Sequence, residues 1–195
     1  IYNLIIQTQD GLYLVKDRFG VRPFFYGHKS DNIIICGSET VCCDENVMFS
    51  QEVKPGEIIY IGENKNIIPY KTKKQKVIHK LYQLQEKHIN QAFCMFEYFY
   101  FMNHHSKLNN ETLYDIRFKF GNLLAKNDIS NNLNLNSEET IVVGSPNSGI
   151  AAGEGYALYS GLRYEQCIKK REDVGRTFIL PTDKERKEAC SLSLI

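Results

Sequence analysis

The first 70 residues of the chain alternate short apolar runs with turn residues. The runs are rich in Ile, Tyr and Phe, and Asp-Gly, Pro-Gly and Gly-Glu-Asn sequences separate them. This pattern predicts a mostly antiparallel β region. The predicted strands cover residues 1–8, 11–16, 23–27, 32–36, 57–61 and 66–71.

The next segment, residues 72–91, is polar and begins with a lysine-rich stretch. It offers little apolar surface to bury, so we expect it to connect two domains, with its lysines in solvent.

From residue 92 the apolar positions follow a helical spacing. Residues 93–102 are strongly aromatic, and residues 112–126 predict a helix with Asn110 as its N-cap. The expected apolar face of that helix consists of Leu113, Ile116, Phe120 and Leu123. Residues 127–139 are rich in Asn and Ser and predict a polar surface loop.

A strand, loop and helix are predicted after that loop. Residues 140–144 are a β-branched run, residues 145–149 are a turn cluster, and residues 150–160 are Ala-rich with helical spacing. A second strand is expected at residues 163–168. This order fits the start of a parallel α/β sheet. It also directs backbone N–H groups and a helix N-terminus toward whatever occupies the loop.

A basic segment, residues 168–181, follows the second strand. It places four cations around Gly175 and ends in an apolar run closed by Pro181. Taken alone, such a cluster is typical of a solvated surface. Next to a loop suited to anions, it also fits a mobile lid over a polyanion.

Composition narrows these possibilities. The 43% hydrophobic and 24% charged content is that of a globular protein. A net charge of +1 gives no bulk attraction to nucleic acid or to an anionic membrane, so any anion site must be local. The apolar runs are too short for a membrane helix. The six cysteines lack C-x-x-C spacing, which favours reduced thiols in the cytoplasm. The chain opens at Ile1 inside a strand pattern, so we expect a piece of a longer protein.

Several motifs together resemble the glutamine phosphoribosylpyrophosphate amidotransferases, and the resemblance covers most of the length. The D-R-F-G-V-R-P run at 17–23 and Ser38-Glu39 are similar to glutaminase domains with an N-terminal nucleophile in general. The F-E-Y-F-Y-F run at 96–101 and the V-G-R-T-F-I run at 174–179 resemble this family alone. The other matching elements are residues 53–57, Cys94, Arg117, Gly121, residues 124–125 and residues 145–148.

The resemblance implies a mixed fold of α/β and α+β type. Residues 1–71 would be the C-terminal part of an αββα glutaminase domain with an N-terminal nucleophile. Residues 72–91 would be the linker. Residues 92–195 would begin a type I phosphoribosyltransferase domain with a parallel α/β sheet.

The same resemblance implies an enzyme, a pentosyltransferase that opens purine biosynthesis. The family forms 5-phosphoribosylamine from phosphoribosylpyrophosphate and glutamine, and purine nucleotides inhibit it by feedback. It further implies a homo-oligomeric, cytoplasmic full-length protein, without nucleic acid or membrane partners. Mg²⁺ would be the cofactor, with its ligands outside this chain.

Candidate site residues are carried over from the matching motifs. The substrate-binding candidates are Lys169, Arg171, Arg176, Arg117, Asn147 and Ser148. Arg117 could instead be a plain exposed arginine, and Ser145 to Ser148 could be an ordinary turn. Cys94 matches an iron–sulfur ligand of some members, but a cluster needs about four thiolates, so a buried free thiol is favoured. Asp17, Arg22, Ser38 and Glu39 are expected to hold turns and sheet edges together.

Four departures from the family pattern count against activity of this chain alone. Ile1 supplies no nucleophile, so no catalytic residue of the glutaminase reaction is expected here. The V-D-D-S-I-V-R-G-T-T element that binds ribose 5-phosphate does not occur in residues 1–195. Glu172 and Asp173 place two carboxylates in the basic segment, and Asn147 stands where the family has Asp.

Two further hypotheses remain open at this point. The departures fit a degenerate, non-catalytic protein of the same fold that binds a nucleotide or a partner. An asparagine-synthetase-like protein would explain residues 17–23, but not the second half of the chain.

Overall fold

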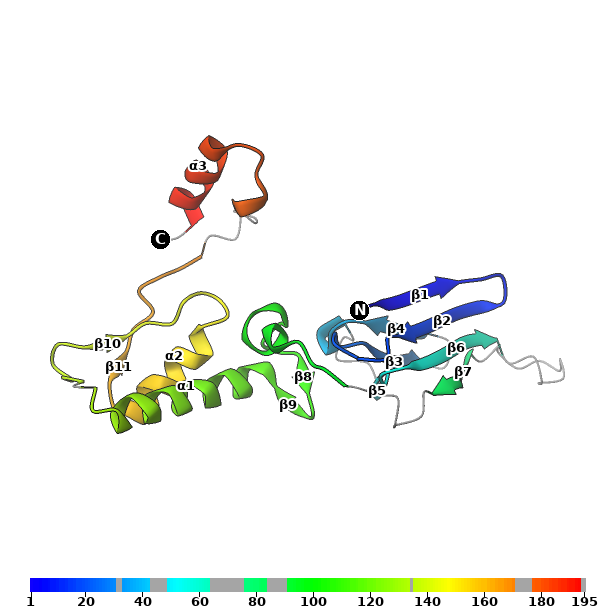
Figure 1. Ribbon diagram of the computed structural model, residues 1–195, viewed down its shortest axis with the longest axis horizontal. Helices are drawn as coiled ribbons and strands as arrows, with labels where there is room; N and C mark the ends of the chain where they lie inside the picture. The colour runs from blue at the N-terminus through cyan, green and yellow to red at the C-terminus, as the bar shows by residue number, and fades with distance from the viewer. Residues whose placement is uncertain are drawn as a thin grey trace. The chain divides into compact units, whose positions relative to one another are not determined.

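The computed structural model shows two compact units, Ile1–Asn110 and Glu111–Ile195 (Figure 1). The structure describes residues 1–30, 33–42, 49–63, 76–83, 91–133, 135–170 and 177–193. The division after Asn110 leaves residues 92–110 in the first unit, whereas the sequence pattern assigns them to the second domain.

The first unit contains two antiparallel sheets. The four-stranded sheet has the order β1-β2-β6-β7, and the three-stranded sheet has the order β4-β3-β5. The strands of the first sheet are β1 (Asn3–Gln7), β2 (Gly11–Lys16), β6 (Glu57–Glu63) and β7 (Lys76–Gln83). Those of the second are β3 (Phe25–Ser30), β4 (Ile33–Gly37) and β5 (Phe49–Glu52). A 3₁₀-helix, Thr40–Cys42, follows β4.

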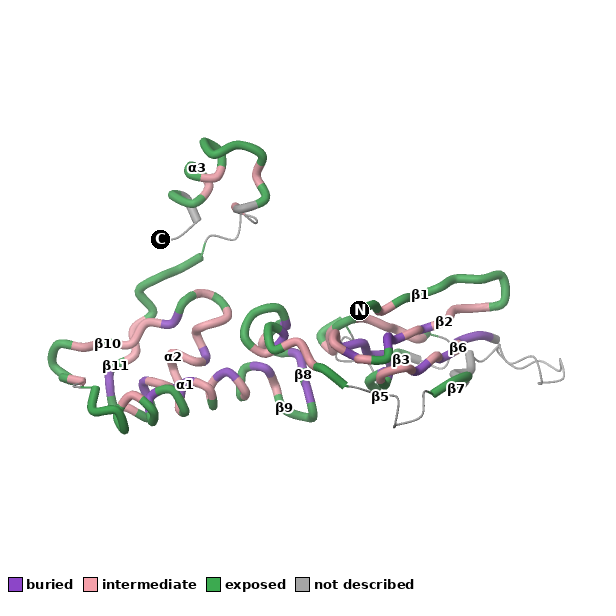
Figure 2. The backbone as a smooth tube through the Cα atoms, viewed as in Figure 1, coloured by how far each residue is buried: buried purple, intermediate pink, exposed green. Residues whose placement is uncertain are grey.

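One apolar cluster joins the two sheets. Its buried members are Leu14, Phe24, Tyr26, Val53, Ile59 and Ile61. Leu14 and Ile59 are cross-strand partners in β2 and β6, and Tyr26 comes from β3. Buried and half-buried residues alternate in the second half of β2 and along most of β6, whereas the start of β3 is buried at consecutive positions (Figure 2).

Five of the predicted strands are confirmed, with small shifts of their ends, and together they give the expected antiparallel β region. The strand predicted at 66–71 lies outside the described residues. β5 was not predicted. The connection predicted at 72–91 is wrong for Lys76–Gln83, which pairs with β6 as an edge strand. Lysines are compatible with a strand there because an edge is solvated and charge discourages further pairing.

Asp17 and Glu39 bind backbone and side-chain groups across turns of the first unit. The Asp17 carboxylate accepts hydrogen bonds from the N–H groups of Tyr2, Phe19 and Gly20. Glu39 Oε2 accepts from Asn103 N at 2.7 Å and from Ser106 Oγ at 2.8 Å. These contacts support the structural role predicted for both carboxylates.

The aromatic segment after residue 92 is only a short helix. Its regular part is the π-helix Glu97–Phe101, which ends at Met102 in extended conformation. Two short strands follow, β8 (Lys107–Leu108) and β9 (Glu111–Thr112).

In the second unit, α1 (Leu113–Ser130) is longer than predicted and starts differently. Its N-cap is Thr112, whose Oγ1 accepts from Asp115 N at 3.1 Å. The predicted N-cap Asn110 is wrong, because this residue has a left-handed φ of 67° and lies before β9. The helix also takes in the first residues of the polar loop predicted at 127–139.

α1 packs against α2 (Ile150–Ser160) through glycine (Figure 1). A Cβ on Gly121 would overlap the carbonyl oxygen of Ala152, and a Cβ on Gly155 would overlap that of Phe118. The two helix backbones are therefore in direct contact. This explains why the buried positions of α1 recur every four residues, at Leu113, Arg117, Gly121 and Ala125, visible as repeated bands in Figure 2.

The remaining elements of the second unit are short. They are β10 (Ile141–Val142), β11 (Arg163–Tyr164), the 3₁₀-helix Thr177–Ile179 and α3 (Asp183–Ser193). α3 was not predicted. No helix in the described ranges has the length and apolar content to cross a membrane.

Candidate functional site

The predicted strand, loop and helix of the second unit are confirmed. β10 leads into the loop at residues 144–149, and α2 begins at Ile150. β11 pairs with β10 in parallel, matching Ile141 with Arg163 and Val142 with Tyr164. The chain thus returns from α2 to the same sheet, which places the loop at the carboxyl end of β10. Loops at that edge are where open α/β sheets bind ligands.

The loop folds tightly onto the start of α2. Gly149 N donates to the Ser145 carbonyl at 2.9 Å, and Gly153 N donates to the Gly149 carbonyl at 2.9 Å. Gly144 is buried, and a Cβ there would lie 2.7 Å from Ile150 Cα. Only a residue without a side chain fits this approach, so Gly144 fixes the path from strand to helix.

Two backbone donors of the loop remain available for a ligand. In the part of the chain that the structure describes, the N–H groups of Asn147 and Ser148 donate no hydrogen bond. They immediately precede the Gly149 N-cap of α2, where the helix dipole also favours negative charge. Asn147 is exposed and Ser148 is half-buried. The loop can therefore hold a phosphate-like group at its surface.

The other predicted substrate-binding residues are spread more widely. Lys169 is exposed and follows β11 along the chain. Arg171 and Arg176 lie outside the described residues, as do Glu172 and Asp173. Of the predicted lid, the structure describes residues 168–170 and the part from Thr177 onward.

Arg117 is buried on α1, with 4% of its surface exposed. The alternative that it is a plain exposed arginine is therefore wrong. Its side chain belongs to the α1 stripe that contains Gly121 and Ala125. Phosphate contact by Arg117 stays a prediction.

Two tyrosines of the second unit bind carboxylates across elements. Tyr114 Oη donates to Glu154 Oε2 at 2.5 Å, and Tyr156 Oη donates to Asp128 Oδ2 at 2.9 Å. The hydrogen bond to Glu154 raises the pKa of Tyr114, and burial with the bond to Asp128 raises that of Tyr156. Both bonds join α1 to α2.

Sequence reasoning missed Tyr164, which lies at the end of β11 beside the loop. A Cβ on Gly144 would lie 2.9 Å from Tyr164 Oη. The available signal was its position, because the end of a second parallel strand must lie next to the loop that follows the first.

Cys94 does not lie in a metal-binding group. The Cys94 Sγ lies 3.8 Å from Arg22 Nη1, and the backbone N–H of Cys94 donates to the Val21 carbonyl at 3.0 Å. Within the described residues, no group of three or more His, Cys, Asp or Glu side chains could hold a metal ion. Cys94 therefore has no group of metal ligands around it among the described residues.

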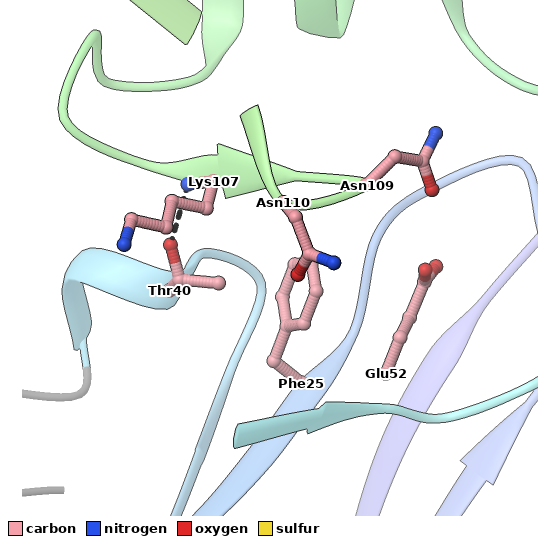
Figure 3. A pocket seen from close by; sticks show the side chains of 6 residues that line it. All are labelled: Phe25, Thr40, Glu52, Lys107, Asn109 and Asn110. Atoms are coloured by element: carbon pink, nitrogen blue, oxygen red, sulfur yellow. Dashed lines mark hydrogen bonds between the residues drawn. The ribbon is translucent and has the colours of Figure 1, made fainter. Parts of the chain in front are cut away.

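A hollow of about 310 Å³ lies in the first unit. Figure 3 shows the Glu52 carboxylate and the Asn109 side chain pointing toward one another across it. Its lining residues are Phe25, Thr40, Glu52, Lys107, Asn109 and Asn110. None of the predicted substrate-binding residues belongs to this set, so the hollow shares no residue with the candidate anion loop.

Comparison with known proteins identifies relatives along the whole chain. The amidophosphoribosyltransferase of Methanothermobacter thermautotrophicus is 31% identical over 194 residues, which is 99% of this chain and 36% of that protein. The amidophosphoribosyltransferase of Methanocaldococcus jannaschii is 31% identical over 204 residues, covering 99% of this chain and 40% of that protein. No family model matches the chain.

A solved structure has the same fold over the same span. It is the glutamine phosphoribosylpyrophosphate amidotransferase of B. subtilis complexed with ADP and GMP, with a TM-score of 0.73 and 27% sequence identity. The match covers 99% of this chain and 38% of that chain. The chain thus spans well under half the length of the relatives that it matches.

Proposed function

Because the chain is related along its whole length to the amidophosphoribosyltransferases, we propose that it is part of an enzyme that forms 5-phosphoribosylamine from phosphoribosylpyrophosphate and glutamine. The similarity over 99% of the chain carries this proposal. The described fold is mixed α/β, as in the solved relative. In the finer assignment, unit 1 contains the end of a glutaminase domain and unit 2 begins a type I phosphoribosyltransferase domain.

In this proposal the loop at residues 144–149 binds the pyrophosphate part of the substrate. The free N–H groups of Asn147 and Ser148 support the assignment, together with the N-terminus of α2. They would stabilise the negative charge that develops as pyrophosphate leaves. Lys169, Arg171 and Arg176 would add cations from the segment that follows β11, and that segment would close over the substrate.

The remaining expectations belong to the same proposal. The intact protein would be a cytoplasmic homo-oligomer, inhibited by purine nucleotides, and it would use Mg²⁺ held by residues outside this chain. The complex of the B. subtilis protein with ADP and GMP is consistent with nucleotide binding.

The test is an assay of the intact protein with phosphoribosylpyrophosphate and ammonia, which bypasses the glutaminase reaction. We expect release of pyrophosphate that depends on ammonia. Ser148→Pro removes one of the two free backbone donors and should raise the KM for phosphoribosylpyrophosphate. Ser160→Ala, at the other end of α2, is the control and should not. Among the described residues, Ser160 Oγ hydrogen-bonds only to the Ala157 carbonyl and to Leu162 N, both at 3.4 Å.

A second function stays open because Asn147 carries no charge and because two carboxylates, Glu172 and Asp173, occur in the basic segment. In this alternative the protein is a degenerate, non-catalytic relative that binds a nucleotide or a partner. Absence of turnover with ammonia, combined with retained nucleotide binding, would favour it over the enzyme.

A further inference from the structure

Tyr164 lies directly behind the candidate anion loop. It is the second residue of β11 and the parallel partner of Val142, the last residue of β10. A Cβ on Gly144 would lie 2.9 Å from its Oη, and a Cβ on Gly153 would lie 3.1 Å from its Cε2. The ring therefore occupies space that exists only because both neighbours are glycine.

The hydroxyl of Tyr164 is buried and has no partner at hydrogen-bond geometry among the described residues, so its own proton has no acceptor there. Burial raises its pKa, and the Glu154 charge adds to this, while the Gly144 N–H, which lies near the phenol oxygen, opposes it. A buried hydroxyl without a partner is costly, and phenylalanine would fill the same space without that cost. A tyrosine here is best explained by a hydrogen bond that forms in another state of the loop.

The Gly149 carbonyl is the acceptor suited to this bond. It lies 3.1 Å from the same Cβ point of Gly144 that Tyr164 Oη approaches to 2.9 Å, so both oxygens face one spot. Gly149 O already accepts from Gly153 N, but a carbonyl has a second lone pair. Because both oxygens lie close to this one point, a shift of the loop can bring them into hydrogen-bond geometry.

We propose that Tyr164 is a positioning residue for the anion loop, donating from Oη to the loop backbone only when a phosphate or pyrophosphate group is bound. The inference rests on the proposed function of the loop. In the free protein the hydroxyl lies beside the Gly144 N–H and donates no hydrogen bond to the described residues. When an anion draws the N–H groups of Asn147 and Ser148 toward it, the loop backbone moves and the phenol fixes the new position.

The experiment compares Tyr164→Phe with the wild type in the intact protein, using inorganic pyrophosphate as the probe. Calorimetry should give an affinity about five- to tenfold lower for Tyr164→Phe, the effect of one hydrogen bond. Its melting temperature without ligand should equal or exceed that of the wild type. In the ammonia assay, the KM for phosphoribosylpyrophosphate should rise while kcat changes by less than about twofold.

Tyr159→Phe is the matched control, because Tyr159 is an exposed residue of α2 with 48% of its surface accessible. It should change neither affinity nor melting temperature. Equal pyrophosphate affinity of Tyr164→Phe and the wild type would overturn the inference. A lower melting temperature of ligand-free Tyr164→Phe would also overturn it, because the hydroxyl would then be bonded already. If the wild type binds no pyrophosphate, the proposed function itself fails.

Discussion

Arg22 Nε lies 2.8 Å from Glu97 Oε1, and this ion pair ties the turn after β2 to the π-helix of the first unit. The Arg22 guanidinium also lies 4.7 Å from the centre of the Phe101 ring. Glu97 has only 5% of its side chain exposed, whereas Arg22 has 42%. The carboxylate is thus the partner that depends on the contact.

We expect Arg22→Ala to lower the free energy of unfolding by about 1–3 kcal/mol, because it leaves a buried carboxylate unpaired. The partial exposure of Arg22 keeps the loss below that of a fully buried pair. Urea denaturation measures the change. Arg18→Ala is the control, since Arg18 is exposed and stacks only on Phe19 at 4.5 Å. Equal losses for both variants would show that the ion pair contributes nothing.

Glu97 should make stability depend on pH. Burial raises its pKa and Glu39 adds to this, although Arg22 lowers it. A carboxyl with a raised pKa binds its proton more tightly when folded. The protonated carboxyl of Glu97 therefore contributes its full stabilisation of the fold below the pKa of about 4.3 that it has in the unfolded chain. This contribution to the free energy of unfolding is lost as pH rises through the pKa of the folded state. Glu97→Gln removes this loss, so the melting temperature of the wild type relative to Glu97→Gln should fall as pH rises.

Melting curves of both proteins between about pH 4 and pH 7 test this expectation. Glu138→Gln, at an exposed carboxyl, serves as the control. A difference between the wild type and Glu97→Gln that stays constant over this range would contradict it.

Gly121→Ala should destabilise the second unit. Helix propensity alone would favour alanine by about 1 kcal/mol. The new methyl group would overlap the Ala152 carbonyl, which forces α1 and α2 apart and costs about 1–3 kcal/mol or more. The net change should be a loss. Asn127→Ala, on the exposed side of the same helix, should instead give a small gain. Thermal unfolding followed by circular dichroism compares them, and a gain in both would refute the backbone contact.

Thr182→Ala should loosen the start of α3. Thr182 Oγ1 accepts from Glu185 N at 3.3 Å, and Glu185 Oε2 accepts from Thr182 N at 3.1 Å, which is a capping box. Loss of the cap costs about 1 kcal/mol of helix stability. Amide hydrogen exchange at Glu185 should become faster by roughly fivefold, while Thr182→Ser should restore protection. Unchanged exchange in Thr182→Ala would count against the cap.

The sequence predicts some parts of this fold well because their local signals are strong. The β-branched run at 140–144, the turn cluster and the Ala-rich helix each have a distinct composition, and the structure confirms all three. β7 was missed because its lysines obscure the alternating pattern of a strand. An edge strand pairs with one neighbouring strand only, so it tolerates such charges. α3 was missed although Thr182 and Glu185 have capping-box spacing.

The buried face of α1 was predicted only in part, for a physical reason. The large apolar residues at that spacing include Leu123, which is 61% exposed. The true contact stripe uses Gly121 and Ala125, because α2 approaches to backbone distance and only small residues fit. Large apolar residues predict the buried face of a helix where it packs through side chains. They do not predict it where two helix backbones are in contact. The burial of Arg117 and of the Tyr164 hydroxyl also depends on packing between distant elements, which spacing along the chain does not report.

The reciprocal glycine contacts restrict how this part of the chain can change during evolution. A larger residue at Gly121 or Gly155 could enter only if the two helices separated, and the start of α2 would then move away from β10. Substitutions at these two positions are therefore coupled to the shape of the loop at 144–149, although neither glycine belongs to that loop. Exposed positions such as Leu123 and Leu158 carry no such constraint, so their side chains can vary while the loop keeps its geometry.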